Sequence, residues 1–444
     1  MTYIPHTPAE RDAMLAAIGA STLDDLFAHL SADVKSGVLK FPKGLGEMEL
    51  AAEMSRRARK NKSTGELVCF LGAGAYDHFI PPVVDQLVLR GELYTAYTPY
   101  QPEISQGVLQ LIYEYQTMMA SLCGCDVANA SLYDGGTAVM EACQMALRHT
   151  GRTRLLLDGA LHPHYLETVK SLLRFQGVEM PIVAPGPGDY RSDLAGLASR
   201  VTDQVAAIVV GYPGLFGAVS DISPAAHAAH KAGALLIAVS DPFAFGLLQP
   251  AGSLGADIVC GEAQSLGVPL QYGGPYLGYV ACKKDLVRRM PGRLVGQTVD
   301  VKGRRAFTLT LQAREQHIRR EKATSNICTN SALCAMMAHF YMSCVGQDGL
   351  RRAGELCAVK ADLLRRKLRG AKGVASVPEY PVFSEFVFET VEPAAKVLER
   401  LLGAGILGGL DLGQFDKARA RQILVAVTEK RTEADIEAYV RAVG

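Results

Sequence analysis

The feature that most constrains the fold is a series of short, fully apolar runs separated by stretches with helical periodicity. The runs occupy Leu155–Leu157, Ala206–Val210, Leu235–Val239 and Ile258–Cys260. Runs of this length that are apolar on both faces are typical of parallel strands buried between layers of helices. With 444 residues, 49% of them apolar, the chain can bury a core of that size. The sequence therefore predicts an α/β protein with a large, mainly parallel sheet.

The regions on either side of this series predict two further parts. The start of the chain contains a capping box at Thr7–Glu10 and a second amphipathic helix over Glu47–Lys60, which together suggest an arm of the kind that packs on a partner. Beyond the large domain, a helical section from Ser331 to about Arg369 leads to strands at Val382–Phe388 and Gln422–Val427. We expect a helical arm over 1–62, a large domain over 63–330 and a smaller α/β domain over 331–444.

Charge and cysteine content exclude several classes of function. The net charge of +1 argues against a nucleic-acid-binding or membrane-surface protein. The start of the chain has no basic stretch followed by an apolar run, and no apolar stretch approaches the length of a membrane span. The 10 cysteines lack the paired spacing of a zinc site, so we expect no metal centre and reduced thiols in a cytoplasmic protein.

A glycine turn that enters a helix is the first motif with chemical content. It runs from Asn129 to Thr137 and contains Ser131, Gly135 and Gly136. Free N–H groups and the helix dipole favour an anion at such a turn, and the two hydroxyls of Ser131 and Thr137 could add donors. In enzymes that use pyridoxal phosphate (PLP), the 5′-phosphate binds at such a turn. An ordinary strand–turn–helix junction explains the same residues.

Asp241 follows the run Leu235–Val239, and an acid at that position suits a PLP ring. A carboxylate there keeps the pyridine nitrogen protonated, which makes the ring an electron sink. The Schiff-base lysine would then follow on the next strand, and the interval fits Gln264, since 264 − 241 = 23 residues. No lysine lies between Lys231 and Lys283. Taken alone, Asp241 is better explained as part of a turn-forming Asp-Pro. His162 follows the first strand, where an aromatic ring commonly stacks on the cofactor, and a loop histidine explains it at least as well.

Two polar segments contain the remaining candidates. The first includes Tyr97, Tyr100 and Glu103, and its density of tyrosines, amides and acid is typical of a segment that positions a polar ligand. The second includes Thr324 and Asn326 just before a helix, where capping alone could account for them. Lys322 is an alternative Schiff-base lysine that is out of order for this fold. The basic cluster Arg314–Lys322 favours a solvated face.

At this point the chain resembles a known family. The segments YTPYQPEISQGVLQLIYEYQT, SLYDGGTA, LLQPAGSLGADIV, QYGGPYLGY, REKATSNICTN and AVTEKRTEADIEAYV are similar to the first subunit of split P-proteins of the glycine cleavage system. The likeness runs from about Ile4 to the end of the chain. It implies the aspartate aminotransferase-like fold, fold type I of the PLP-dependent transferases. One departure is Gly214, where the family has Asn, and this weakens a polar role for that loop.

The resemblance implies an aminomethyl-transferring glycine dehydrogenase that works only as a complex. A homologous subunit 2 would hold PLP covalently, in a dimer of heterodimers. Together with that partner, the chain would decarboxylate glycine and pass the aminomethyl group to the lipoyl arm of the H-protein. Tyr97, Tyr100, Glu103, Thr324 and Asn326 would line the shared active site. Ser131, Gly135, Gly136, Thr137, His162 and Asp241 would be remnants of a cofactor site, with Gln264 in place of the lysine.

Two other hypotheses remain open on the sequence. The chain could be a scaffolding or regulatory subunit of the same complex, with an inert pocket. It could also be a complete PLP enzyme that uses Lys322 or another lysine.

Overall fold

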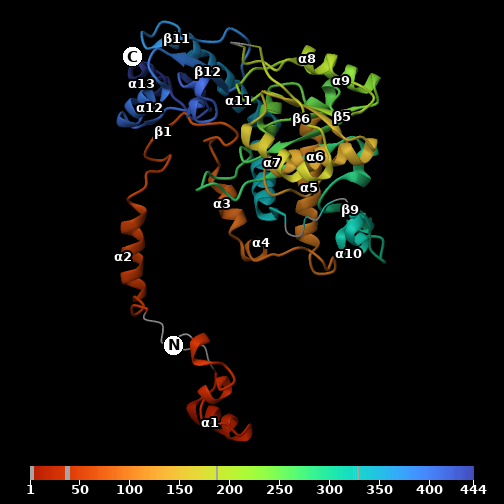
Figure 1. Ribbon diagram of the computed structural model, residues 1–444, viewed down its shortest axis with the longest axis vertical. Helices are drawn as coiled ribbons and strands as arrows, with labels where there is room; N and C mark the ends of the chain where they lie inside the picture. Colours follow the sequence, from red (N-terminus) through yellow and green to blue (C-terminus); the bar gives the residue numbers. More distant parts are fainter. Residues whose placement is uncertain (1–4, 36–40, 187–188, 324, 326, 328–329) are drawn as a thin grey trace. The chain divides into compact units, whose positions relative to one another are not determined.

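The computed structural model describes residues 5–35, 41–186, 189–323, 325, 327 and 330–444. The chain forms two compact units, Met1–Lys62 and Ser63–Gly444 (Figure 1). Among the described residues, no helix combines the length and the apolar content that crossing a bilayer requires. The further division that the sequence predicts at residue 330 stays a prediction.

The first unit contains helices α1 (Pro8–Ala17) and α2 (Glu47–Ala58). The predicted capping box is present, since the Thr7 amide donates to the Glu10 carboxylate at 2.6 Å and the Glu10 amide donates to the Thr7 hydroxyl at 3.3 Å. Ile18 and Met48 are exposed, whereas Leu15 is buried. This unit therefore has little apolar core of its own.

A seven-stranded sheet forms the centre of the second unit. Its strand order is β2-β8-β7-β6-β5-β3-β4. The neighbours from β7 to β4 are parallel, whereas β8 is antiparallel to both β7 and β2. The four predicted apolar runs all form strands of this sheet. Its strands are β2 (Val127–Ala128), β3 (Arg154–Asp158), β4 (Ile182–Val183), β5 (Val205–Gly211), β6 (Leu235–Val239), β7 (Ile258–Glu262) and β8 (Gly278–Cys282).

Helices cover both faces of this sheet. Leu156 and Ile208 point into a core cluster shared with α5 and α9, whereas Leu155 and Val209 point into another shared with α6 and α7. Because side chains alternate between the two faces along a strand, a run that is apolar throughout contributes side chains to both cores. The helices of this part of the chain are α3 (Pro82–Val88), α4 (Gly91–Tyr94), α5 (Gln106–Cys123), α6 (Gly135–Thr150), α7 (Pro163–Leu173), α8 (Leu194–Ser199) and α9 (Ser223–Lys231).

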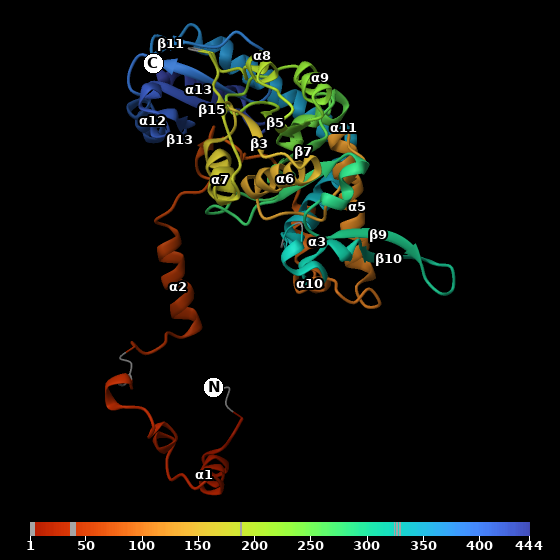
Figure 2. The ribbon, with the colours of Figure 1, turned by 45° about the vertical axis from the view of Figure 1, so that its right-hand side comes forward.

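A hairpin and a short helix follow the large sheet. Strands β9 (Leu294–Val299) and β10 (Arg305–Thr310) pair antiparallel and extend away from the rest of the unit (Figure 2). Helix α10 (Gln316–Arg319) comes next in the chain. The base of the hairpin packs on α5 through Val295, Phe307 and Leu309.

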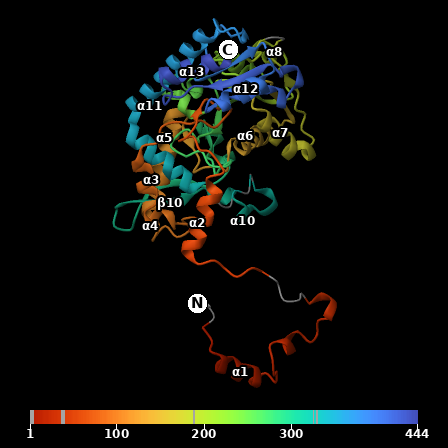
Figure 3. The same ribbon diagram turned by 90° about the vertical axis from the view of Figure 1, so that its left-hand side faces the viewer.

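The C-terminal residues form a smaller four-stranded antiparallel sheet of order β11-β12-β15-β14. Helix α11 leads to it along one side of the unit and departs from helical geometry at Gly346 (Figure 3). The predicted strand Val382–Phe388 begins three residues late, because Val382 pairs instead with Ala218 of the large part. The elements are α11 (Ala332–Leu368), β11 (Val374–Ser376), β12 (Glu385–Thr390), α12 (Ala394–Gly403), β13 (Ile406–Leu407), β14 (Leu410–Asp411), β15 (Gln422–Ala426) and α13 (Glu433–Val443), and β13 pairs with β1 (Val68–Cys69).

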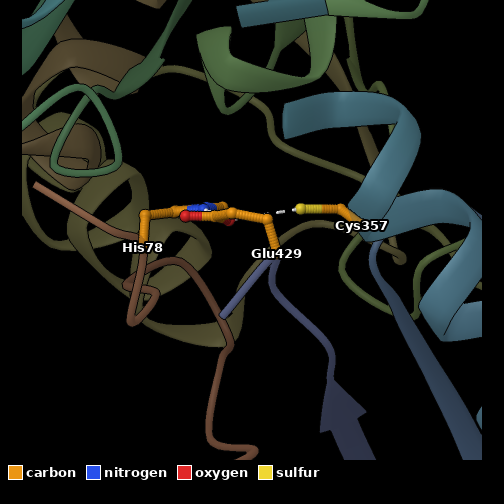
Figure 4. A group of neighbouring side chains, drawn as sticks. All are labelled: His78, Cys357 and Glu429. Carbon is orange, nitrogen blue, oxygen red and sulfur yellow. Dashed lines mark hydrogen bonds and ion pairs between the residues drawn. The ribbon is translucent and has the colours of Figure 1, made fainter. Parts of the chain in front are cut away.

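A buried polar clasp joins the segment before α3 to the segment after β15. His78 Nδ1 lies 2.6 Å from Glu429 Oε2, and the Cys357 thiol lies 3.5 Å from the same oxygen (Figure 4). Beside them, Asp77 pairs with Lys430 at 2.6 Å and with Arg431 at 3.0 Å. We call Asp77, His78, Cys357, Glu429, Lys430 and Arg431 the polar clasp. Its hydrogen bonds account for the close grouping of imidazole, thiol and carboxylate.

Candidate active site

The carboxyl ends of the parallel strands meet at one edge of the large sheet, where ligands bind in open α/β folds. Asp241 follows β6, and Glu262 ends β7. Both line a cavity that we call the sheet-edge cavity, whose other wall comes from β12 of the small sheet through Glu385. His162 and Tyr165 of the α7 region also line it. The structure thus brings the predicted residues Asp241 and His162 together.

Ser265 faces Asp241 more closely than Gln264 does. The Ser265 hydroxyl donates a hydrogen bond to Asp241 Oδ1. The Gln264 side chain instead binds backbone, accepting from the Tyr76 amide at 2.8 Å and donating to the Val268 carbonyl at 2.7 Å. The position opposite the acid therefore carries a hydroxyl, and no amine of the described residues is bonded to Asp241.

At the start of α6, amides that were predicted to bind a ligand anion donate instead to carboxylates of the protein. The helix begins at Gly135 rather than after Thr137, because Asp134 caps it by accepting from the Thr137 amide at 2.8 Å. The Gly135 amide donates to Glu262 Oε2 at 3.0 Å. Two carboxylates therefore lie at the N-terminus where the sequence predicted a ligand anion.

Of the other predicted cofactor residues, Thr137 and His162 are hydrogen-bonded within the protein. The Thr137 hydroxyl donates to Asp134 Oδ1 at 2.9 Å. Ser131 is fully buried, and its hydroxyl has no hydrogen-bond partner among the described residues. His162 caps α7 by accepting from the His164 amide at 3.1 Å, and its ring lies 4.9 Å from that of Tyr165. Burial lowers the pKa of His162 to about 4, so the ring is neutral at physiological pH.

Three carboxyl groups share the sheet-edge cavity. Burial raises the pKa of Glu262 to about 7 and that of Glu385 to about 7, and it also raises the pKa of Asp241. Glu385 accepts from the Ala73 amide at 2.6 Å and from the Tyr76 hydroxyl at 3.0 Å. A cavity with this lining is unsuited to a further anionic group.

A second cavity lies at the base of the β9–β10 hairpin, and we call it the hairpin cavity. Its lining includes Tyr100 and Ser325, one from each of the two predicted polar segments, together with Arg293 and Arg314. Arg293 is 7% exposed, donates to the Tyr100 hydroxyl at 3.1 Å and lies over its ring at 5.1 Å. The hairpin cavity therefore combines a phenol, a hydroxyl and two guanidinium groups with the carboxylate of Glu315 and the imidazole of His317.

The remaining predicted pocket residues have other positions. Tyr97 is 66% exposed and Glu103 is exposed, and neither is in the described lining of the hairpin cavity. Thr324 and Asn326 lie outside the described residues. Lys322, the alternative Schiff-base lysine, is exposed at the end of a 3₁₀ turn. Within the basic cluster, Arg319, Arg320 and Lys322 are exposed, as expected of a solvated face. Arg314 is the exception, because its guanidinium donates to the Met290 and Gly292 carbonyls.

The sheet-edge cavity does not fit PLP bound as the fold would bind it. The first N–H of α6 already donates to Glu262, so a phosphate dianion would lie against a buried carboxylate. Opposite Asp241 the side chain is a serine, which cannot form an imine. The acid that would face the ring nitrogen is present, but the Gly135 amide is taken by Glu262, and no lysine among the described residues is bonded to Asp241.

Glu262, Ser265 and Arg293 are among the residues of these sites that sequence reasoning did not find. Glu262 is the last residue of β7, two residues before Gln264. An acid at the carboxyl end of a parallel strand is a signal that could have identified it from the sequence. Ser265 directly follows Gln264 in the sequence. Which of the two side chains faces Asp241 depends on the course of the backbone after β7, which the sequence does not show. Arg293 has no sequence signal, because it reaches Tyr100 across a separation of 193 residues.

Comparison with known proteins gives one consistent family. The family model described as "Glycine cleavage system P-protein" matches residues 1–443. A protein of Desulforamulus reducens named "Probable glycine dehydrogenase (decarboxylating) subunit 1" is 48% identical over 100% of this chain and 99% of its own. A protein of the same name from Moorella thermoacetica is also 48% identical, over 100% and 99%.

Solved structures agree on the fold. A crystal structure of glycine decarboxylase (P-protein) of the glycine cleavage system, in inhibitor-bound form, superposes with a TM-score of 0.91 at 43% identity, covering 100% of this chain and 99% of that one. A sphingosine-1-phosphate lyase of Burkholderia pseudomallei superposes with a TM-score of 0.63 at 14% identity, covering 94% of each chain. The predicted fold class, fold type I of the PLP-dependent transferases, is confirmed.

Proposed function

Because the chain belongs to the glycine cleavage system P-protein family, we propose that it is a glycine decarboxylase subunit whose active site is completed by a homologous PLP-bearing chain. The observation that carries the proposal is the pair of side chains at the end of β7. Ser265 takes the position opposite Asp241, and Glu262 takes the first N–H of α6. A chain with this arrangement needs its cofactor to come from elsewhere.

The residues of this chain that serve the reaction are, in this proposal, those of the hairpin cavity. PLP on the partner supplies the electron sink for the loss of CO2 from glycine. Arg293 and Tyr100 form a hydrogen-bonded pair that can bind and orient an anionic group such as the glycine carboxylate. Ser325 adds a hydroxyl, itself bonded to Glu141 at 2.5 Å. Tyr97, Glu103, Thr324 and Asn326 remain predicted members of the same shared site.

The other assignments follow from the family and stay proposals. The partner is a homologous subunit 2 in a dimer of heterodimers, and the aminomethyl group passes to the lipoyl arm of an H-protein. The exposed apolar residues of the first unit, among them Ile18 and Met48, support a role for that unit in assembly.

Reconstitution tests the proposal. We expect the purified chain with PLP to show no glycine–bicarbonate exchange and no imine absorbance near ~420 nm. Mixed with its homologous partner, it should restore exchange in proportion to the complex formed. Exchange by the chain alone would refute the proposal in favour of a complete enzyme. Full exchange by the partner alone would favour the scaffolding role.

A further inference from the structure

Glu262 is bound in the way that proteins bind a small anion. Its Oε2 accepts from the Gly135 amide at 3.0 Å, and its Oε1 accepts from the Gln264 amide at 3.0 Å and the Leu277 amide at 2.7 Å. The residue is 6% exposed. Three backbone donors thus converge on one buried carboxylate.

Helix α6 supplies the electrostatic part of this site. Gly135 is its first residue, and the N-terminus of a 16-residue helix carries partial positive charge. Among the described residues, the groups that lower the pKa of Glu262 are backbone amides, those of Leu277, Gly135 and Gln264, whereas burial and the nearby Asp134 carboxylate raise it. Backbone amides and the helix terminus are therefore what balances the carboxylate.

The space above the turn is filled by the chain itself. A Cβ placed on Gly135 would lie 2.3 Å from the Tyr165 hydroxyl and 2.9 Å from Glu262 Cβ. Glycine is required at 135 because these two side chains lie directly on the turn. Glu262 also lines both the sheet-edge cavity and a neighbouring cavity over the start of α6, so it forms part of the wall between them.

We propose that Glu262 is a built-in anionic ligand of helix α6, which keeps phosphate-bearing molecules out of the sheet-edge cavity. Truncating its side chain frees the Gly135, Gln264 and Leu277 amides around the space that the side chain occupies. The turn then becomes a site for a phosphate group. This inference goes beyond the proposed function and concerns the chain without its partner.

Phosphate binding by the full-length chain tests the inference. Inorganic phosphate is titrated at pH 8 and constant ionic strength, with affinity measured by calorimetry and by the shift in melting temperature. We expect Glu262→Ala to bind phosphate at least tenfold more tightly than the unchanged chain. Glu262→Gln keeps the volume but loses the charge, and we expect a smaller gain in the same direction.

Glu385→Ala is the matched control. It removes an equal charge from the same cavity, but Glu385 bonds to Ala73 and Tyr76 rather than to α6. We expect no gain in phosphate affinity from it. An equal gain in this control, or no gain in a folded Glu262 variant of either kind, would overturn the inference. The proposed function also cites the Glu262–Gly135 bond, but its own test is separate, because it is read from exchange by the two-chain complex.

Discussion

Replacing Arg293 with methionine is expected to lower the glycine–bicarbonate exchange rate of the reconstituted complex by about 100-fold, since misplacing a group by about 1 Å costs on that order. The guanidinium is 7% exposed and donates to the Tyr100 hydroxyl, so it both lines the hairpin cavity and fixes the phenol. Methionine keeps much of the apolar contact and removes the charge and the donors. Assembly of the two chains, measured by sedimentation, should be unchanged.

Arg305→Met is the control for this prediction. Arg305 also lies over an aromatic ring, that of Phe307 at 5.6 Å, but it is exposed on β10. Its loss removes the same charge from the same hairpin, and we expect exchange within about twofold of the unchanged complex. Equal losses in both variants would mean that the charge of the hairpin matters rather than the Arg293–Tyr100 pair.

Glu429→Gln is expected to destabilise the chain by about 2 kcal/mol at pH 7, because the buried His78 ring and the Phe79 amide lose their bonds to a charged carboxylate. The Glu429 and His78 side chains are 12% and 4% exposed. Burial alone would raise the pKa of Glu429, but the hydrogen bond and charge of His78 outweigh it and lower the pKa to about 2. Chemical denaturation of the variant and the unchanged chain measures the difference.

The pH dependence of this difference has a definite sign. The pKa of Glu429 is depressed from its ordinary value of 4.5. Its stabilising contribution is therefore complete above about pH 4.5 and disappears as the pH falls toward 2. Glu437→Gln, which breaks the exposed pair with Lys367, should change stability by at most about 0.5 kcal/mol. A Glu429 effect that grew as the pH fell from about 4.5 toward 2 would contradict this account of the polar clasp.

The large sheet was predictable because its strands are buried on both faces. Alternating residues such as Leu155 and Leu156 serve opposite cores, so the sequence shows an apolar run with no polar interruption. The small sheet was predicted less accurately, since β12 begins at Glu385 and Val382 pairs with Ala218. Pairing between distant segments leaves no trace in local periodicity.

The candidate site was predictable only at strand ends. Asp241 follows an apolar run, and a parallel sheet brings such positions to one edge. The sequence alone does not show whether Gln264 or Ser265 lies opposite Asp241. The answer depends on the direction of the backbone after β7, because a shift of one residue turns a side chain to the other face. The positions of the other two residues come from distant contacts. Glu262 binds Gly135, which is 127 residues away in the sequence, and Arg293 binds Tyr100, which is 193 residues away.

The position of the covalently bound cofactor in the reconstituted complex is the most direct test. Borohydride reduction fixes PLP to the lysine that holds it, and peptide mass spectrometry then identifies the labelled chain. The account predicts a pyridoxyl-lysine on the partner and none on this chain. A labelled peptide from this chain, at Lys322 or any other lysine, would contradict it.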